Sequence, residues 1–220
     1  MKSLKSIAVA LCAALVLAGC NMSNTGKGAL IGAGGGAGLG AVIGAIAGNT
    51  AVGAVIGGAV GAGAGALIGK KMDKAKKEAE AVQNAQVEAV TDANGLEAVK
   101  VTFDSGILFA TGKADLSSTA MTSLFQFTNV LKSNADCDVA VQGYTDNAGW
   151  KNCNAAQSQQ KNLELSQGVS STQIRSTQGF GESNPVADNS TAAGKAQNRR
   201  VEVYMYASQK MIQEAQQQAQ

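Results

Sequence analysis

The sequence contains no histidine, and this absence removes a broad group of functions. Histidine is a frequent general base in enzymes and a frequent ligand of zinc. A histidine-dependent hydrolase or a zinc enzyme is therefore excluded. No constellation of nucleophile, base and metal ligands is visible elsewhere in the chain. We expect a protein that is not an enzyme and that needs no metal and no cofactor.

Cysteine is scarce, and its four positions have no metal-ligand spacing. They are Cys12, Cys20, Cys137 and Cys153. In an oxidising compartment Cys137 and Cys153 are compatible either with one disulfide or with two unrelated thiols. Sequence alone does not supply the Cα separation that would decide between these alternatives.

Net charge is also absent once the first nineteen residues are set aside. They contain Lys2 and Lys5 and no acid, which leaves sixteen basic and sixteen acidic side chains in the rest of the chain. A nucleic-acid-binding protein needs a basic field that neutralises phosphates. The neutral balance argues against nucleic acid as a partner.

The N-terminus has the layout of a signal peptide over residues 1–19. Lys2 and Lys5 precede an uncharged apolar run at residues 7–17 that is too short to span a bilayer comfortably. Residues 17–20, Leu-Ala-Gly-Cys, resemble a lipobox, which implies cleavage before Cys20 and a diacylglyceryl group on its thiol. An ordinary signal peptide with a chance cysteine is the alternative.

Acyl chains on Cys20 would give a firm membrane attachment, because each buried methylene contributes about 0.8 kcal/mol. Residues 20–27 would then be a lipidated N-terminus. No cluster of acids lies in residues 21–26. By the sorting patterns that such lipoproteins resemble, we expect a lipid-anchored protein of the bacterial outer membrane that faces the periplasm.

Charge is missing altogether from residues 28–69, which Lys27 and Lys70 bracket. Glycine recurs there every four residues in two series, at positions 28, 32, 36, 40, 44 and 48 and, after a one-residue slip, at 53, 57, 61, 65 and 69. A four-residue period places each series along one helix face, and in lipid such rows let two helices approach closely.

The two glycine series predict a membrane-associated helical hairpin over residues 28–69, with arms of about twenty residues and roughly 30 Å each. The segment resembles the glycine-zipper segments of small bacterial outer-membrane lipoproteins. Its partners would be the lipid bilayer and copies of itself in a homo-oligomer. A hairpin packed only against such copies outside the bilayer, or a flexible Gly/Ala linker, are the alternatives.

Residues 70–85 open with a basic cluster of Lys70, Lys71, Lys74, Lys76 and Lys77. Beside a membrane segment, such a collar favours anionic head groups. A solvated helical linker is equally compatible with the pattern. Both interpretations make residues 70–85 a basic helical spacer.

Residues 86–207 have the pattern of a globular domain. Strands are predicted at 87–90 and 96–103, joined by a turn with an Asn-Gly signal, and at 139–141 and 201–206. A helix is predicted from residue 115, with a core stripe at helical spacing made by Leu116, Ala120, Leu124, Phe127 and Leu131. Residues 208–220 read as a short polar helix or a frayed end without chemistry.

Four separated motifs between residues 101 and 206 resemble an OmpA-like peptidoglycan-binding domain. They are Phe103-Asp104-Ser105 with Phe109, Gly143-Tyr144-Thr145-Asp146-Asn147-Ala148-Gly149, Gly179-Phe180-Gly181-Glu182-Ser183-Asn184-Pro185, and Asn198-Arg199-Arg200-Val201-Glu202-Val203. The resemblance implies an α+β fold, a two-layer α/β sandwich of βαβαβ type. It also implies noncovalent recognition of the diaminopimelate stem peptide of the cell wall.

The resemblance assigns Thr145 and Asp146 to the peptidoglycan site, where Asp146 would pair with the amino group of diaminopimelate. A zwitterionic head group needs an acid for its ammonium and a guanidinium for its carboxylate at fixed spacing. The sequence departs from the family in the second half of this pair. Asn154 stands at the family's asparagine position, but Lys161 follows where an arginine belongs.

A second register places the family's Asn-x-x-Leu-Ser motif at residues 162–166, so that residues 150–161 are an insertion and the arginine-bearing helix turns are missing. In the first register Lys161 keeps a charge but loses the bidentate fork. Under either register Arg199 is the one strong remaining candidate for the carboxylate. Its alternative role is structural, at the start of the final strand.

Two functions of different classes follow from these observations. In the first, the domain binds peptidoglycan while Cys20 and the hairpin hold the membrane, so that the protein tethers the outer membrane to the wall. In the second, the glycine-zipper hairpins oligomerise as a membrane-structural protein whose OmpA-like domain has weakened or lost its binding.

Overall fold

The structure is a computed structural model that describes residues 60–92, 95–104, 117–147 and 168–220. The predicted signal peptide, Cys20 and most of the glycine series lie outside these ranges, as do Asn154 and Lys161. The described elements are α5 (Ala62–Glu80), β1 (Ala85–Thr91), β2 (Glu97–Asp104), α7 (Ser118–Ser133), β3 (Cys137–Tyr144), β4 (Ile174–Gly181), α9 (Ala192–Asn198), β5 (Arg200–Ala207) and α10 (Gln209–Gln218).

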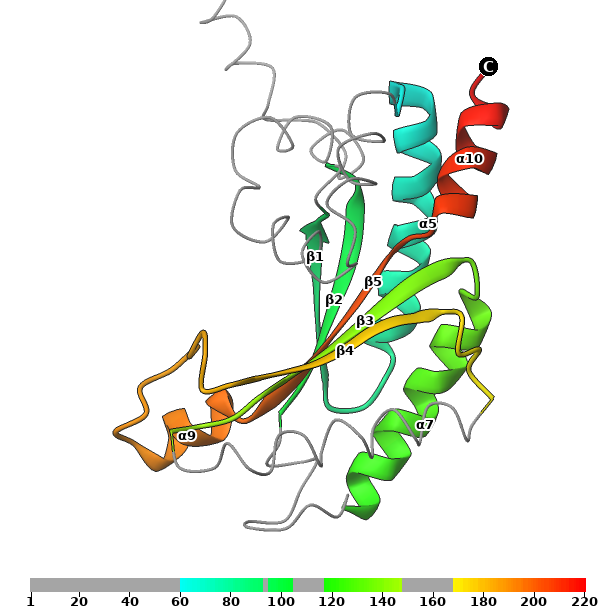
Figure 1. The fold of residues 1–220 in the computed structure, drawn as a ribbon. Helices are drawn as coiled ribbons and strands as arrows, with labels where there is room; N and C mark the ends of the chain where they lie inside the picture. Colours follow the sequence, from blue (N-terminus) through cyan, green and yellow to red (C-terminus); the bar gives the residue numbers. More distant parts are fainter. Residues whose placement is uncertain (1–59, 93–94, 105–116, 148–167) are drawn as a thin grey trace, which may run out of the picture.

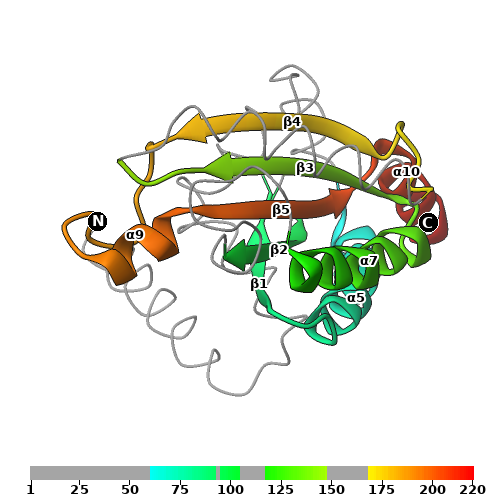
Figure 2. The same ribbon diagram turned by 90° about the horizontal axis from the view of Figure 1, so that it is seen from below.

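The five strands form one mixed sheet in the order β1-β2-β5-β3-β4. Its pairs are antiparallel except for β3 and β4, which run parallel. Helix α5 packs against β1, β2 and β5 and contacts α7, and Figure 2 shows both helices on the same side of the sheet. The predicted α+β, two-layer fold is confirmed.

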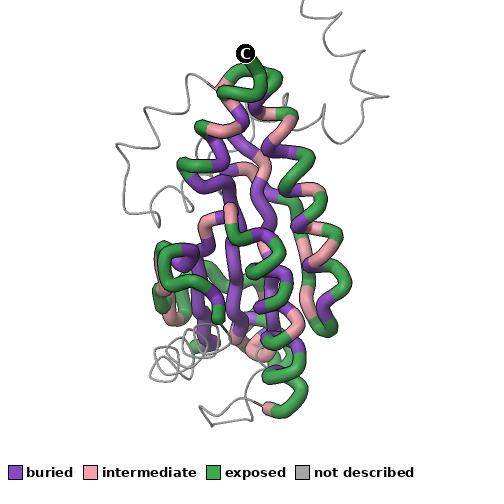
Figure 3. The backbone as a smooth tube through the Cα atoms, turned by 90° about the vertical axis from the view of Figure 1, so that its right-hand side faces the viewer, coloured by how far each residue is buried: buried purple, intermediate pink, exposed green. Residues whose placement is uncertain are grey.

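The core fills the space between these helices and the sheet. Phe127 of α7 and Phe103 of β2 meet edge to face, with ring centroids 5.4 Å apart. Ile68, Leu124 and Val203 are fully buried around them, and burial of such a side chain contributes about 1.5–3 kcal/mol. Figure 3 shows buried residues concentrated along the strands and on the inward helix faces.

The first hairpin forms where the sequence predicts it. Strands β1 and β2 pair from Ala85↔Phe103 to Thr91↔Glu97. The Asp92 carboxylate accepts a hydrogen bond from the Leu96 amide at 2.8 Å, and Gly95 adopts a φ of +74°. That conformation costs glycine little. Two features of the turn therefore fix the register of the hairpin: the hydrogen bond that Asp92 accepts and the positive φ of Gly95.

Helix α7 is confirmed together with its core stripe. Ser117 caps its first turn, because the Ser117 hydroxyl accepts a hydrogen bond from the Ala120 amide at 3.0 Å. The stripe members Ala120, Leu124, Phe127 and Leu131 are all buried. Leu116, the remaining predicted member, lies outside the described residues.

Residues 70–80 are helical, as predicted, but they belong to α5 and pack against the core, so they are not a solvated spacer. Ile68, Met72, Ala75 and Ala79 have no measurable exposure and belong to the core. They recur every three to four residues, so one helix face is apolar while the charged residues occupy the other. The lysines of the exposed face make i,i+4 ion pairs such as Lys76–Glu80 at 3.4 Å.

The boundary predicted for the hairpin also shifts. Residues 62–69, assigned from the sequence to its second arm, form the first two turns of α5. In the part of the chain that is described, no helix is both long and apolar enough to cross a membrane. The hairpin interpretation of residues 28–59 lies outside the described residues.

The C-terminal segment is a helix with a buried face. Ser208 caps α10 by accepting a hydrogen bond from the Met211 amide at 3.1 Å. Met211, Ile212 and Ala215 are buried, and α10 lies beside α5 (Figure 1). The folded domain therefore extends from α5 to α10, beyond the predicted limits of 86 and 207.

Candidate functional site

Parts of all four motifs meet at one end of the sheet. Phe103 pairs with Val201 across β2 and β5, while Tyr144 at the end of β3 pairs with Arg200 on one side and with Gly181 on the other. The Thr145 amide then donates to the Gly181 carbonyl at 2.8 Å. Segments about forty to a hundred residues apart in sequence are brought together by strand pairing. Figure 1 shows α9 at this end, away from α10.

At this end of the sheet, Asp146 and Arg199 form an ion pair. An Asp146 carboxylate oxygen lies 2.6 Å from Nη1 of Arg199, which is a short charge-assisted hydrogen bond. The Asp146 side chain is only 7% exposed, whereas that of Arg199 is 37% exposed. A buried carboxylate is thus covered by a guanidinium that faces solvent.

Thr145 sits next to this pair and brings a second polar atom. Its hydroxyl oxygen is buried and has no hydrogen-bond partner among the described residues. A buried polar group in that state costs about 1–3 kcal/mol.

The short helix α9 positions Arg199, which directly follows it. Thr191 caps α9 by accepting from the Gly194 amide at 3.0 Å, and the Arg199 amide donates to the Lys195 carbonyl at 3.1 Å. A Cβ added at Gly194 would lie 2.0 Å from the Asp188 carbonyl oxygen. Glycine is therefore required there for the helix to pack on the preceding loop.

Asn198 ties that loop to the site. Its side-chain oxygen accepts from the amides of Val186 and Ala187 at 2.7 and 2.9 Å. Its amide nitrogen donates to the Ala187 carbonyl and to the Asn189 side chain at 2.8 and 2.9 Å. The asparagine of the Asn-Arg-Arg motif thus supports the backbone around Arg199.

Arg200 differs sharply from its neighbour because it is buried. Its Nε lies 2.6 Å from Glu202, Nη2 donates to the Asn184 carbonyl at 3.1 Å, and the guanidinium lies 3.9 Å from the centroid of the Tyr144 ring. Tyr144 stacks in turn on Phe180 with ring centroids 5.5 Å apart. Arg200 therefore carries the structural role that sequence reasoning considered for Arg199.

Sequence reasoning did not single out this supporting cluster of Tyr144, Phe180, Arg200 and Glu202. A signal for it was present in the spacing of Arg200, Glu202 and Tyr204, since alternate residues of a strand share one face. Tyr204 confirms the pattern, because its hydroxyl donates to Glu202 at 2.7 Å. The cluster holds the ends of three strands beside the Asp146–Arg199 pair.

The structure brings Thr145, Asp146 and Arg199 together, and Asn154 and Lys161 fall outside the described residues. Within the described ranges, no group of three or more metal-ligating side chains is present. Cys137 lies at the opposite end of β3 from Tyr144, where it pairs with Ala207, and it is a free, buried thiol. The arrangement suits the binding of a ligand that carries both charges.

Comparison with known proteins supports the resemblance seen in the motifs. Residues 108–199 match the OmpA family, and residues 1–73 match the YMGG-like Gly-zipper family. The Probable lipoprotein YiaD of Escherichia coli is 44% identical over 108 residues, which cover 47% of this chain and 46% of that protein. The Peptidoglycan-binding protein ArfA of Mycobacterium tuberculosis is 35% identical over 102 residues, covering 44% of this chain and 31% of that protein.

The chain thus spans less than half the length of these two relatives. Among solved structures, a MotB-like protein from Desulfovibrio vulgaris superimposes with a TM-score of 0.53 at 20% identity, covering 63% of this chain and 93% of that one. At this identity the likeness concerns the fold alone. The chain carries an OmpA family domain in its C-terminal half, preceded by a YMGG-like Gly-zipper segment.

Proposed function

We propose that the C-terminal domain binds peptidoglycan noncovalently by gripping the diaminopimelate group of its stem peptide. The observation that carries this proposal is the pair of Asp146 and Arg199, a buried carboxylate joined at 2.6 Å to a half-exposed guanidinium. The name of the relative ArfA describes a peptidoglycan-binding protein, which agrees with the proposal.

Binding would proceed by exchange of partners. The ligand ammonium takes the place of Arg199 beside Asp146, and the ligand carboxylate takes the place of Asp146 beside Arg199. A buried charge left without a partner is strongly unfavourable, by about 3–5 kcal/mol. A ligand with only a carboxylate would therefore take Arg199 away from the buried Asp146 carboxylate without replacing it, and a ligand with only an amine would leave Arg199 to pair with water, whereas a zwitterion provides a partner for both.

Arginine suits its half of this exchange better than lysine. Its planar fork can donate two parallel hydrogen bonds to one carboxylate, which lysine cannot. Arg199 projects from the α9–β5 junction, and its exposure leaves the guanidinium accessible from solvent. Arg199 would supply the bidentate contact to the ligand carboxylate that a lysine such as Lys161 does not make.

Membrane attachment completes the proposed function. A lipid on Cys20 and the glycine-rich segment would anchor the chain in the outer membrane, facing the periplasm, and the domain would tether that membrane to the wall. The YMGG-like match over residues 1–73 and the lipoprotein name of the relative YiaD support this part. Oligomerisation through the glycine series belongs to the same proposal.

Co-sedimentation of the full chain with purified diaminopimelate-type peptidoglycan tests the binding. We expect wild type to pellet, Asp146→Asn to bind about tenfold more weakly or worse, and Arg199→Lys to lose several-fold, since each factor of ten corresponds to about 1.4 kcal/mol. Asp138→Asn is the matched control, because Asp138 forms an ion pair with Arg175 at 3.0 Å elsewhere on the sheet.

Thermal unfolding of each variant shows whether a loss reflects the site or the fold. If wild type stays in the supernatant, or if Asp146→Asn pellets as wild type does, the binding proposal is wrong. The alternative of an oligomerising membrane-structural protein would then be preferred.

A further inference from the structure

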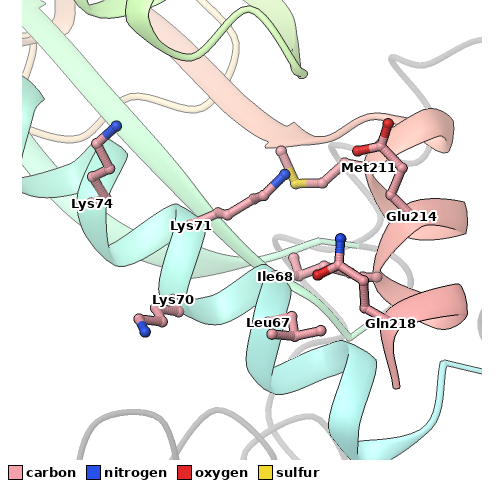
Figure 4. Close-up of a pocket in the computed structure, with 9 residues that line it drawn as sticks. Leu67, Ile68, Lys70, Lys71, Lys74, Met211, Glu214 and Gln218 are labelled. Atoms are coloured by element: carbon pink, nitrogen blue, oxygen red, sulfur yellow. The ribbon is translucent and has the colours of Figure 1, made fainter. Parts of the chain in front are cut away.

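A groove with a cavity volume of about 300 Å³ runs between α5 and α10. Leu67 and Ile68 from α5 and Met211 and Ala215 from α10 form its apolar floor (Figure 4). Leu67 is partly exposed there, and the other three are buried beneath it. The volume is at the lower end of the range for small-molecule sites. It is sufficient for a stretch of hydrocarbon about ten methylenes long, each occupying close to the ~30 Å³ of a water molecule.

The rim of the groove is basic on the α5 side. Lys70, Lys71 and Lys74 are its lining residues on α5, and Glu214 and Gln218 line it on α10. Figure 4 shows the Lys71 side chain extending toward α10, whereas that of Lys70 points away from it. Lys71 is held by Asp136 at 2.7 Å, and Lys74 lies 3.6 Å from Glu78. Glu214 is the single acid among the lining residues. An apolar floor with lysines along its α5 side is complementary to an acyl chain attached to an anionic head group.

The groove lies at the end of the domain opposite Asp146 and Arg199. Strand β5 begins at Arg200 beside the candidate site and ends at Ala207, directly before α10. Eight residues of strand separate the two ends by roughly 26 Å. In Figure 1 the start of α5 and the end of α10 lie together at the end away from α9.

Chain continuity adds a second argument for lipid at this end. Helix α5 begins at Ala62, inside the uncharged stretch that ends at Gly69. The lysines of the groove follow at once. The groove is therefore built from the last turns of the apolar stretch and the first charged residues after it.

We propose that this groove docks the domain on an anionic membrane surface, with a phospholipid acyl chain on the Leu67–Met211 floor and its phosphate beside Lys70, Lys71 and Lys74. The proposal rests on the membrane attachment in the proposed function. It goes beyond that function because it assigns a lipid site to the folded domain. The domain would then be oriented with Asp146 and Arg199 pointing away from the membrane.

Lipid contact is measured on the full lipidated chain in vesicles. A bimane label on Gln218→Cys reports lipid contact at the groove, and one on Ser183→Cys reports lipid contact at the opposite end of the domain. Both variants carry Cys153→Ser, and Cys137 is buried, so the label attaches to the introduced cysteine. The vesicles contain phospholipid with brominated acyl chains, either phosphatidylglycerol or phosphatidylcholine. We expect bromine to quench the label at residue 218 in phosphatidylglycerol only, and not the label at residue 183 in either.

Charge reversal tests the lysine rim. Since a basic residue near an anionic surface contributes about 1 kcal/mol, or about fivefold, the Lys70→Glu/Lys74→Glu pair should lower the affinity for phosphatidylglycerol on the order of 20-fold or more. Lys77→Glu/Lys132→Glu changes the net charge equally at exposed lysines outside the groove. This control should keep the quenching.

Quenching that is equal in the two lipids, or that survives the Lys70/Lys74 reversal, overturns the proposal. So does a chain that floats with vesicles but shows no quenching at residue 218, as expected if a second copy or the chain's own acyl group filled the groove. If the chain does not float with the vesicles, both the groove proposal and the proposed membrane anchor are wrong. Peptidoglycan pelleting of the same variants should be unchanged, which separates failure of the groove from failure of the wall site.

Discussion

At the scale of single residues, two adjacent arginines have opposite roles. Arg199 is the C-cap of α9, and its half-exposed guanidinium pairs with Asp146. Arg200 opens β5, is 5% exposed, and pairs with Glu202, which is 7% exposed. A step of one residue in extended backbone turns the side chain to the other face. The same residue type is therefore accessible to a ligand at one position and packed in the interior at the next.

This difference predicts different effects on stability. Arg200→Ala leaves the Glu202 charge buried without its partner and removes the contact with the Tyr144 ring, so we expect a loss of about 3–5 kcal/mol in the free energy of unfolding. Arg199→Ala should cost less, about 1–2 kcal/mol, because the side chain that it removes is 37% exposed and water can take its place beside the Asp146 carboxylate. Urea denaturation followed by circular dichroism measures both. Equal losses would contradict the assignment of roles.

Cys137 makes a second prediction at the residue scale. Burial raises the pKa of the Cys137 thiol to about 12, so the reactive thiolate is nearly absent until the pH rises far above 8. In a Cys153→Ser variant, we expect a thiol reagent at pH 8 to leave Cys137 unmodified in the native protein. The same reagent should modify it fully in guanidinium chloride. Rapid modification without denaturant would show that the thiol is accessible.

At the scale of elements, the folded domain is built on α5 as much as on the OmpA motifs. The helix packs on three strands and carries a fully buried stripe that includes Ile68 and Met72. Its partner α10 adds a second buried face from the C-terminal segment. Helix α5, which contains residues 62–69 of the glycine-rich stretch, therefore packs directly on the sheet, with α10 beside it.

The role of α5 in the core is testable by truncating its buried side chains. Ile68→Ala or Met72→Ala should lower the free energy of unfolding by about 2–5 kcal/mol, as large-to-small core substitutions do. Lys77→Ala, on the exposed face of the same helix, is the control and should change it by less than about 0.5 kcal/mol. Thermal or urea unfolding decides the matter. If neither core substitution changes the free energy of unfolding, α5 is a spacer and not part of the core.

Sequence patterns predicted the elements whose apolar residues are large and regularly spaced. Helix α7 and the β1–β2 hairpin were found in this way, because Leu124 and Phe127 repeat at helical spacing and an Asn-Gly signal marks the turn. In α5 the buried stripe consists partly of alanine, Ala75 and Ala79, and the lysines between them obscure it. Strand β4 is an edge strand of largely polar sequence, so neither alternation nor propensity reveals it.

The sequence predicted the individual residues of the candidate site, but it did not predict that Asp146 and Arg199 contact each other. The motifs pointed to Asp146 and Arg199 separately, one for an ammonium and one for a carboxylate. Their contact depends on the register that places Tyr144 opposite Arg200 across β3 and β5. Fifty-three residues separate the two side chains, and no local pattern specifies which strands become neighbours.

At the scale of the whole molecule, the domain has a proposed binding site at each of two opposite ends. The candidate wall site lies at one end of β5, and the groove between α5 and α10 lies at the other. The glycine-rich segment enters at the groove end, because α5 is its continuation. This polarity agrees with a tether that presents its binding site away from its anchor.

The central claim is that the Asp146–Arg199 pair opens for a ligand with both charges, and competition tests it most directly. A soluble stem peptide containing diaminopimelate should release the full chain from peptidoglycan. The same peptide with lysine in place of diaminopimelate lacks the carboxylate for Arg199, and we expect it to be at least about tenfold less effective. Equal competition by the two peptides, or none by either, would contradict the account.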